Sequence, residues 1–414
     1  MAASLVAGFS GTVRREELSG RAFFCGQMAS RMARKVVRQQ YLMGVLYQLP
    51  GKGTMGNLAT SEFGYALKSM PFLAQEQCRQ VVSQVVRREI CLSFALHRQL
   101  GRLASLYASY LERYPFGVWG PGLLVTTEMH RQTELYLPLA AIWPGWRQTL
   151  EAGLAVRQPD RGDEFLAAPS WLAILERLAL PIPVAPHRLL QEVMTDAEMR
   201  ECFLFAWQLP RHHGGGFDRY PEQRAWLADW LAARRPAGGA IACLDAACGS
   251  GEGTYELAAA LMQDGHAPEQ VAVHGVTLQP LEVVAAAMAY FPHDRGRQVA
   301  YRARLAGMLS PEFIGRIDFR LGNLLGGLPT GQAYDVILCN GLLGGPMLHG
   351  RQQGERVMRG LASRLAPGGI LLADDQFHAG WRKRVPHVEM QCWLQAAGLQ
   401  PLTLPRGIGG VACR

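Results

Sequence analysis

The sequence lacks the features that mark membrane, secreted and disordered proteins. Among its 414 residues there is no apolar run of about 18 or more, so we expect no membrane-spanning helix. The nine cysteines include no Cys-x-x-Cys pair, which favours reduced thiols in a cytoplasm over a disulfide framework. No basic residue precedes the short apolar stretch at the N-terminus, so a secretory signal is not expected. A hydrophobic content of 49% excludes wholesale disorder and allows a packed core.

Lysine is also rare, since 38 of the 42 basic residues are arginine. Residues 1–113 hold 15 basic and 6 acidic residues, whereas the rest of the chain holds 27 and 28, so the positive balance lies in the first third. A basic region of this kind can attract nucleic acid, an anionic membrane surface or an acidic protein. No basic ribbon with interleaved aromatics and no nucleic-acid motif accompanies it, so we favour solvated helix faces and do not expect nucleic-acid binding.

The first 180 residues have the apolar spacing of helices. Gln27–Leu49 follows this period, and Ala74–Arg113 predicts one long helix or two, with Gly101 as the only breaker. A further helical stretch around Thr126–Leu139 is expected to end before Pro144. We therefore expect an all-α N-terminal domain over residues 1–180 that selects the substrate or partner.

A second segment, residues 181–238, is predicted to be a helical linker, with a helix near His187–Met194. After it, short β-rich runs alternate with helical segments, which is typical of a mostly parallel sheet with both faces covered. Ligands of such sheets bind beyond the carboxyl ends of the strands. The expected strands are Ile241–Ala246, Val271–Val276, Ile317–Leu321, Asp335–Cys339 and Gly369–Ala373.

The strongest motif is the run from Leu244 to Tyr255, in which a strand enters a glycine-rich turn and then a helix near Thr254. Gly249 and Gly251 lack a Cβ, so the backbone can bend tightly and a ligand can approach it closely. Dinucleotide sites also begin in this way, but the third glycine of their fingerprint is missing here. The small residues before Gly249 and the acidic Glu252 favour S-adenosylmethionine, whose ammonium group needs an anionic or carbonyl partner.

This run resembles motif I of class I S-adenosylmethionine-dependent methyltransferases. Three downstream segments extend the resemblance, and two of them are similar to the chemotaxis-receptor (CheR-type) branch: Ile317–Leu325, with its Asn-Leu-Leu turn, and the strand Tyr334–Asn340. The third, Leu365–Leu372, matches the Pro-Gly-Gly turn before the fifth strand. The resemblance covers roughly residues 185–414 and implies a Rossmann-like seven-stranded methyltransferase domain over residues 239–414.

The resemblance also implies roles for individual residues. Arg219 corresponds to the arginine of a segment that precedes the motif I strand in the family, and with His349 it is a predicted substrate-binding residue. Asn340 and Gly341 would face the sulfonium and the incoming substrate, and Tyr255 matches a tyrosine of the family motif. The predicted catalytic residues are Asn340, Tyr255 and His378. The predicted cofactor-binding residues are Asp245, Ala247, Gly249, Gly251, Glu252, Thr277, Gln279, Asn323, Asn340 and Gly341.

The sequence departs from the family pattern after its second strand, where an acid binds both ribose hydroxyls. Thr277 stands at that position, and Gln279 is a candidate to take over part of the role. Replacing a charged acceptor by a neutral one costs about 1.5–3 kcal/mol, which would weaken cofactor binding roughly ten- to a hundredfold. Gly253 replaces the second acid of motif I, and the arginine that precedes Asn340 in the branch is missing. These changes put receptor glutamate specificity in doubt.

The acceptor decides which chemistry is needed. A carboxylate requires only proximity and orientation, whereas a hydroxyl or amine requires a base within hydrogen-bond reach. We prefer O-methylation of a carboxylate or hydroxyl, on a protein, a peptide or a small molecule, and the sequence leaves the oligomeric state open, a homodimer included. Candidate bases near the expected site are His349, Asp374, Asp375, His378, His212 and His213.

Two other functions compete with this hypothesis. A non-catalytic methyltransferase-like binding module is favoured by the neutral Thr277. A di-metal carboxylate site in the helical region would use paired Glu-x-x-His motifs, and none occurs among its candidate residues, so we predict no metal. Those candidates are Glu76, Glu89, His97, Glu128, His130 and Glu134.

The glycine loop generates a direct test. Gly249→Val should abolish binding of S-adenosylhomocysteine, because a branched side chain would occupy the space that the ligand needs, while the protein stays folded. Isothermal titration measures the binding, and circular dichroism checks the fold. Unchanged affinity would show that the loop has another role.

Overall fold

The computed structural model describes residues 65–90, 93–113, 139–155, 175, 185–209, 216–234, 239–328, 331–345, 348–375 and 385–413. Residues 58–414 form one compact unit. Several sequence predictions lie outside the described residues, so the structure does not address them. They are the helix over Gln27–Leu49, nearly all of the helix over Thr126–Leu139, and the candidate bases His212, His213 and His378.

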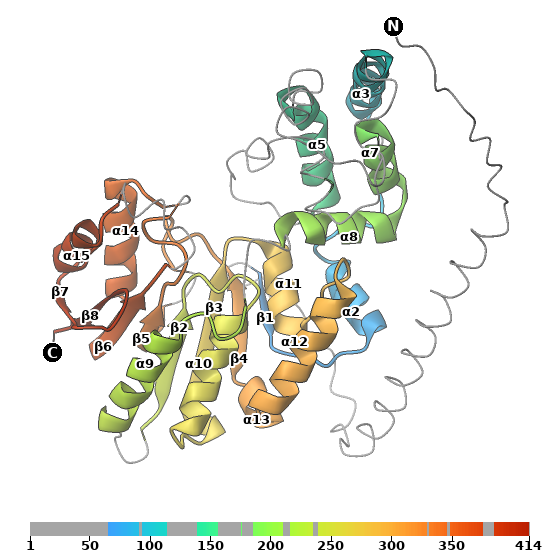
Figure 1. Cartoon of the computed structure of the whole chain (residues 1–414). Helices are drawn as coiled ribbons and strands as arrows, with labels where there is room; N and C mark the ends of the chain where they lie inside the picture. Colours follow the sequence, from blue (N-terminus) through green and yellow to red (C-terminus); the bar gives the residue numbers. More distant parts are fainter. Residues whose placement is uncertain are drawn as a thin grey trace, which may run out of the picture. The chain divides into compact units, whose positions relative to one another are not determined.

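An eight-stranded sheet organises the C-terminal half, in the order β1-β4-β3-β2-β5-β6-β8-β7 (Figure 1). Its five central strands run parallel, and β1, β8 and β7 pair antiparallel with their neighbours. Each predicted strand is present to within four residues at either end, and the Rossmann-like seven-stranded sheet is confirmed. The strands are β1 (Ala66–Lys68), β2 (Ile241–Asp245), β3 (Val271–Thr277), β4 (Ile317–Leu321), β5 (Tyr334–Leu338), β6 (Leu365–Ala373), β7 (Leu399–Pro401) and β8 (Ile408–Ala412).

The eighth strand, β1, comes from the N-terminal region, so the described part of that region is not all-α as predicted. Leu67 pairs with Phe319 of β4, and the backbone amide of Ser69 donates to the carbonyl of Ile317 at 2.9 Å. A three-residue strand is too short for its alternating pattern to be recognised in a sequence. The N-terminal region thus extends the sheet at the edge next to β4.

Helices cover both faces of the sheet because its strands alternate their side chains between two cores. Cys243 belongs to the core cluster that includes α9, α10 and α11, whereas the next residue, Leu244, belongs to the cluster that includes α14 and α15. Crossover helices of this kind are what parallel strands require. The helices are α9 (Pro221–Arg234), α10 (Glu252–Gln263), α11 (Pro280–Met288), α12 (Arg295–Met308), α13 (Pro311–Ile314), α14 (Arg351–Ala362) and α15 (His387–Ala396), and a short 3₁₀ turn, η1 (Pro268–Gln270), precedes β3.

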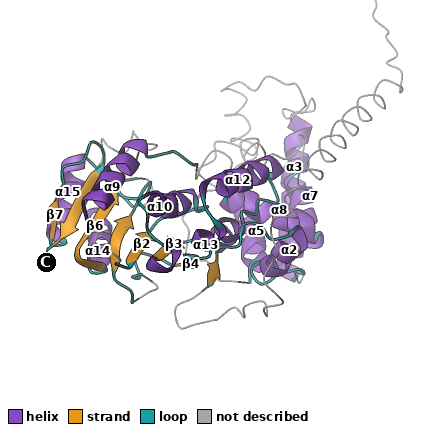
Figure 2. Ribbon diagram, turned by 90° about the horizontal axis from the view of Figure 1, so that it is seen from below, coloured by secondary structure: helices purple, strands orange, loops and turns teal. Residues whose placement is uncertain are grey.

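Four of the N-terminal helices, α3, α5, α7 and α8, pack on one another (Figure 2). Helix α3 packs on α5 and α7. Helices α8 and α2 contact α11, which belongs to the C-terminal α/β fold. One continuous hydrophobic core therefore runs from these helices to one face of the sheet. The elements are α2 (Gln75–Val82), α3 (Phe94–Arg113), α5 (Leu139–Gly153), α7 (Pro186–Thr195) and α8 (Ala197–Gln208).

The stretch Ala74–Arg113 forms two helices, but the break is not at Gly101, which lies inside α3. The helix ends at Ser83 instead, and the following segment pairs with the end of α5: Arg87 N–H donates to the Gly153 carbonyl at 2.8 Å, and Ala155 N–H to the Val85 carbonyl at 2.7 Å. A distant partner for the backbone thus overrides local propensity.

Pro144 also behaves differently from the expectation, because it lies within α5 rather than ending a helix. Proline in a helix interior costs about 3 kcal/mol. Burial offsets this cost: Ile142 and Trp146 on either side are fully buried, and Trp146 stacks on Phe203 with ring centroids 4.9 Å apart. Burying large apolar side chains stabilises by about 1.5–3 kcal/mol each.

Arg200 of α8 holds the N-terminal helices together. Its side chain is 1% exposed. The guanidinium donates to the last carbonyls of α7, those of Val193 and Met194, at 3.0 Å each, and to the carbonyls of Arg87 and Arg88 after α2. The carbonyls of Val193 and Met194 are otherwise left over where a helix ends. One buried cation thus joins the end of α7 to the segment after α2.

We predict that Arg200→Leu lowers the free energy of unfolding by about 3–5 kcal/mol, because it leaves several buried carbonyls without a donor. Urea unfolding followed by circular dichroism measures the change. Arg188→Leu, on the exposed face of α7, is the control and should stay within about 0.5 kcal/mol. A loss below 1 kcal/mol for Arg200→Leu would contradict this role.

Candidate active site

The predicted site residues gather where the parallel strands end. Asp245 is the last residue of β2 and Thr277 the last of β3, while Asn323 and Asn340 follow β4 and β5. These strands are neighbours in the order β4-β3-β2-β5, so their carboxyl ends meet at one edge of the sheet. The strand order reverses at β2, and such a switch point is where open α/β sheets bind ligands.

The glycine-rich loop has the backbone that the sequence predicts. Gly249 and Gly251 have φ of 52° and 94°, in the left-handed region that favours glycine. The amide of Cys248 donates to the Val276 carbonyl at 3.0 Å, which places the loop beside the end of β3. A Cβ added at Gly249 would meet no atom within 4 Å, so the space above this residue is open to a ligand.

Asp245 is buried beneath this loop, with 4% of its surface exposed. Its carboxylate accepts a hydrogen bond from Thr254 Oγ1 at 2.9 Å and another from the backbone amide of Ala247. Burial outweighs these two bonds and raises the pKa of Asp245 to about 6. A carboxylate that is costly to ionise is a common feature of functional sites.

Glu252, expected to face the ammonium group of the cofactor, has protein partners for both carboxylate oxygens. Arg297 of α12 binds Oε1 at 2.9 Å, and Ser250 Oγ donates to Oε2 at 2.7 Å. The side chain of Glu252 is only 3% exposed. This ion pair ties the loop to α12, and a cofactor contact for Glu252 stays a prediction.

Tyr255 was predicted to be catalytic, and the structure places it elsewhere. It is fully buried, and its hydroxyl bonds to Ser69 Oγ at 2.6 Å and to the Ala286 carbonyl at 2.8 Å. Such a hydroxyl does not face a substrate. Tyr255 instead ties α10 to α11 and to the segment after β1.

The residues expected around the ribose and adenine differ in exposure. Thr277 is 6% exposed, and its hydroxyl donates to Glu282 in the first turn of α11. Gln279 is fully buried, which argues against its taking over the ribose contact. Asn323 is exposed after β4, where Oδ1 accepts from the Leu325 amide at 3.0 Å, so it lies at the predicted edge of the site.

Asn340 is held by a residue that sequence reasoning missed. Gln223 of α9 exchanges two hydrogen bonds with the Asn340 amide, at 2.7 and 3.1 Å, and the Asp374 amide donates to Asn340 Oδ1 at 2.9 Å. The neighbouring Gly341 has φ of 72° and donates to the Asp374 carbonyl at 2.8 Å. The ends of β5 and β6 are thus fixed to α9.

Tyr220 is a second residue that the sequence did not single out. Its hydroxyl oxygen lies 3.5 Å from the position that a Cβ on Gly341 would take. Burial raises its pKa, and the nearby carboxylates of Asp375, Asp374 and Asp245 add to this, so the phenol stays protonated at neutral pH. The signal was its position directly after Arg219, in the segment that precedes α9.

The predicted substrate-binding residues are only partly brought together. Arg219 is half-buried in the turn before α9 and acts electrostatically on Tyr220. His349 is exposed just before α14 and is not among the residues that line the cavity described next. His378 lies outside the described residues.

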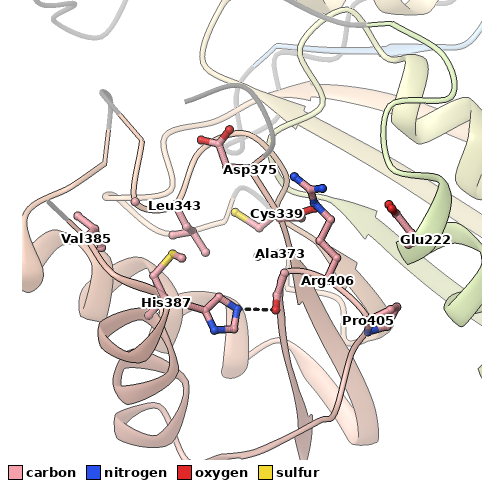
Figure 3. A pocket seen from close by; sticks show the side chains of 13 residues that line it. Glu222, Cys339, Leu343, Ala373, Asp375, Val385, His387, Pro405 and Arg406 are labelled. Atoms are coloured by element: carbon pink, nitrogen blue, oxygen red, sulfur yellow. Dashed lines mark hydrogen bonds and ion pairs between the residues drawn. The ribbon is translucent and has the colours of Figure 1, made fainter. Parts of the chain in front are cut away.

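A cavity of about 390 Å³ opens next to Asn340, beyond the ends of β5 and β6 (Figure 3). Arg406, in the loop before β8, is the only arginine or lysine among the described residues that line it, and its Nε donates to Asp374 Oδ2 at 3.0 Å. The other lining residues are Glu222, Cys339, Leu343, Gly344, Ala373, Asp374, Asp375, Val385, His387, Met390, Pro405 and Gly407.

Comparison with known proteins agrees with this geometry. Residues 224–376 match the family described as "CheR methyltransferase, SAM binding domain". This part of the chain is similar to a CheR-type S-adenosylmethionine-binding methyltransferase domain. Its cofactor is therefore S-adenosylmethionine, and the open backbone at Gly249 fits a ligand at the predicted place.

Similar proteins have methyltransferase names. The chain is 31% identical over 172 residues to the "Probable biofilm formation methyltransferase WspC" of Pseudomonas putida, covering 37% of this chain and 39% of that protein. It thus spans about two fifths of the length of this relative. The N-methyltransferase NodS of Bradyrhizobium japonicum with bound S-adenosylhomocysteine has 16% identity, covers 55% of this chain and 97% of its own, and gives a TM-score of 0.31. The sugar N-methyltransferase KedS8 of a Streptoalloteichus species has 18% identity, covers 48% and 89%, and gives 0.30.

Two further features concern metal sites and membrane spans. Within the described residues, no group of three or more His, Cys, Asp or Glu side chains is arranged to hold a metal ion. Glu76, Glu89 and His97 belong to this part of the chain, whereas Glu128, His130 and Glu134 lie outside it. No helix of the described part is long and apolar enough to span a membrane.

The raised pKa of Asp245 makes a prediction about stability. Between about pH 4 and 6 the folded protein holds a proton that the unfolded chain releases, so the free energy of unfolding falls as pH rises through this window, by about 3 kcal/mol. Asp245→Asn should remove this part of the pH dependence in urea unfolding of the cofactor-free protein. Asp229→Asn, on the exposed face of α9, is the control. If the free energy of unfolding of Asp245→Asn depended on pH as that of the wild type does, this would contradict the raised pKa of Asp245.

Proposed function

We propose that this protein is an S-adenosylmethionine-dependent methyltransferase that methylates a carboxylate, carried by a protein side chain. The observation that carries this proposal is the juxtaposition of two spaces at one edge of the sheet. The open backbone at Gly249 follows β2, Asn340 follows the neighbouring strand β5, and the cavity lies beyond β5 and β6. A donor at the loop and an acceptor in the cavity would then be neighbours along this edge.

S-Adenosylmethionine, when bound, supplies an electrophilic methyl group on a sulfonium that leaves as a neutral thioether. The residues of the chain contribute proximity and orientation, which lower the barrier of such a displacement most. Gln223 and Asp374 fix Asn340 where the two spaces meet, and Tyr220 stays protonated beside Gly341. Tyr220 therefore can donate a hydrogen bond at neutral pH but cannot act as a base.

The lining of the cavity supports a carboxylate acceptor. Arg406 offers a guanidinium with several N–H donors, and Asp374, whose side chain is 3% exposed, accepts from its Nε and so orients it. A guanidinium held in this way recognises a second carboxylate well. A carboxylate is already deprotonated at neutral pH, so the reaction needs no base. A hydroxyl acceptor would need one, for which Asp374, Asp375 and His387 are the candidates in the lining.

We further propose that acceptor choice lies mainly in the N-terminal region, residues 1–180, with residues 181–238 completing the active site. The second part of this proposal is supported by α9, which supplies Gln223 beside Asn340 and Glu222 in the cavity. The first part is supported by the contact of α2 with α11, the helix that follows β3.

The test uses S-adenosylmethionine labelled in the methyl group and three acceptor probes: a glutamate-rich peptide, a lysine-rich peptide and free glutamate. We expect label in the glutamate-rich peptide that dilute alkali releases as methanol, because a methyl ester hydrolyses and an N-methyl group does not. Alkali-stable label in the lysine-rich peptide would contradict the carboxylate assignment, and label in free glutamate alone would contradict a protein acceptor.

Arg406→Gln should raise the KM for the accepted probe at least tenfold and leave the affinity for S-adenosylhomocysteine within twofold. Arg406→Lys should raise the KM less, because lysine keeps the positive charge but not the planar fork of donors. Wild-type protein that binds S-adenosylhomocysteine but labels none of the three probes would favour the non-catalytic binding module. A wild-type protein that gives no binding heat at millimolar S-adenosylhomocysteine would contradict the enzyme assignment itself.

A further inference from the structure

The end of β3 carries an arrangement that neither sequence reasoning nor the family match assigns. Thr277, the last residue of β3, is 6% exposed, and its hydroxyl donates to Oε2 of Glu282. The same hydroxyl accepts from the backbone amide of Gln279 at 3.4 Å. Because its single proton points at Glu282, the hydroxyl of Thr277 has no proton to give a ligand.

Glu282 itself is well placed to meet a ligand that lies along the edge of the sheet. It stands in the first turn of α11, which begins at Pro280, and its side chain is half-buried. A carboxylate is favoured near the positive end of a helix. The two oxygens of a carboxylate have about four acceptor positions in total, so Glu282 can accept other hydrogen bonds besides that from Thr277.

The glycine loop lies next to this carboxylate. Cys248 of the loop is bonded through its amide to Val276, the residue before Thr277. A Cβ on Gly275 would come within 3.0 Å of Cys248 Sγ, so the loop contacts the last residues of β3. Burial raises the pKa of the Cys248 thiol, and the carboxylates of Asp245 and Glu282 raise it further, which means that both acids act on this loop.

We infer that Glu282 binds the ribose hydroxyls of the cofactor and that Thr277 is a positioning residue, which holds the Glu282 carboxylate at the end of β3. A vicinal diol presents two O–H donors, and a carboxylate accepts both. Acids that bind ribose hydroxyls in α/β folds follow the strand next to the glycine loop, and here the acid follows it by five residues. This inference rests on the proposed function, because it deepens the assignment of the same cofactor site.

The experiment compares S-adenosylhomocysteine with its 2′-deoxyribose analogue by isothermal titration. The full-length wild type should bind the parent compound at least tenfold more tightly than the analogue. Glu282→Gln should bind S-adenosylhomocysteine ten- to a hundredfold more weakly and lose most of this discrimination. The amide still accepts the hydrogen bond from Thr277, so a purely structural role for Glu282 would leave both affinities unchanged.

Two further variants keep the result interpretable. Glu269→Gln, at the opposite end of β3 in the exposed turn η1, is the matched control and should bind like the wild type. Thr277→Asp in the Glu282→Gln background places an acid directly at the end of β3 and should recover at least part of both the affinity and the discrimination. Thermal melts check that each variant is folded.

The outcomes distinguish the role of Glu282 from the presence of a cofactor site. Glu282→Gln that binds both compounds like the wild type would overturn the role of Glu282 and leave the cofactor site intact. A wild type that binds S-adenosylhomocysteine but does not discriminate against the deoxy analogue would overturn it as well. A wild type that binds neither compound would overturn the proposed function and this inference together.

Discussion

The site depends on close packing around the ring of Phe319 on β4. This ring is fully buried, and a Cβ at Gly251 or Gly275 would come within 3.0 Å of it. Two glycines are therefore needed for the loop after β2 and the strand β3 to lie against the same aromatic ring. Because protein interiors are packed as densely as organic crystals, even one added methyl group would push the loop away from the sheet. The open backbone at Gly249 is available to a ligand because the rest of the loop is anchored in this way.

Segments far apart in the sequence complete the site on this foundation. Gln223 is 117 residues from Asn340 and fixes the amide at the end of β5. Arg297 closes the other side of the loop through Glu252. The result is one edge of the sheet, with the glycine-rich loop beside β2 and β3 and a cavity beyond β5 and β6. Residues 239–414 alone do not contain all of these contacts, because α9 and β1 come from the sequence that precedes them.

Much of this organisation could be predicted from local patterns. The alternation of strands and helices after residue 239 predicted the five parallel strands, and the glycine-rich run predicted a tight turn, which is present at Gly249. Predictions failed where a distant partner decided the outcome. Gly101 does not interrupt α3, because the break before it is set by backbone pairing with the end of α5. Pro144 stays helical, because its neighbours are buried against α8.

The sequence by itself determined the class of fold and the position of the glycine-rich turn. These follow from features within a few residues of one another, namely side-chain period and the absence of a Cβ, which act without a partner. Only the tertiary structure decided what the polar side chains do. Tyr255 is a buried structural residue because its hydroxyl forms a hydrogen bond with Ser69, 186 residues away. The carboxylate beside Thr277 is visible only once α11 turns back over β3. A hydrogen bond is directional and short-ranged, so its partner is known only when the chain is folded.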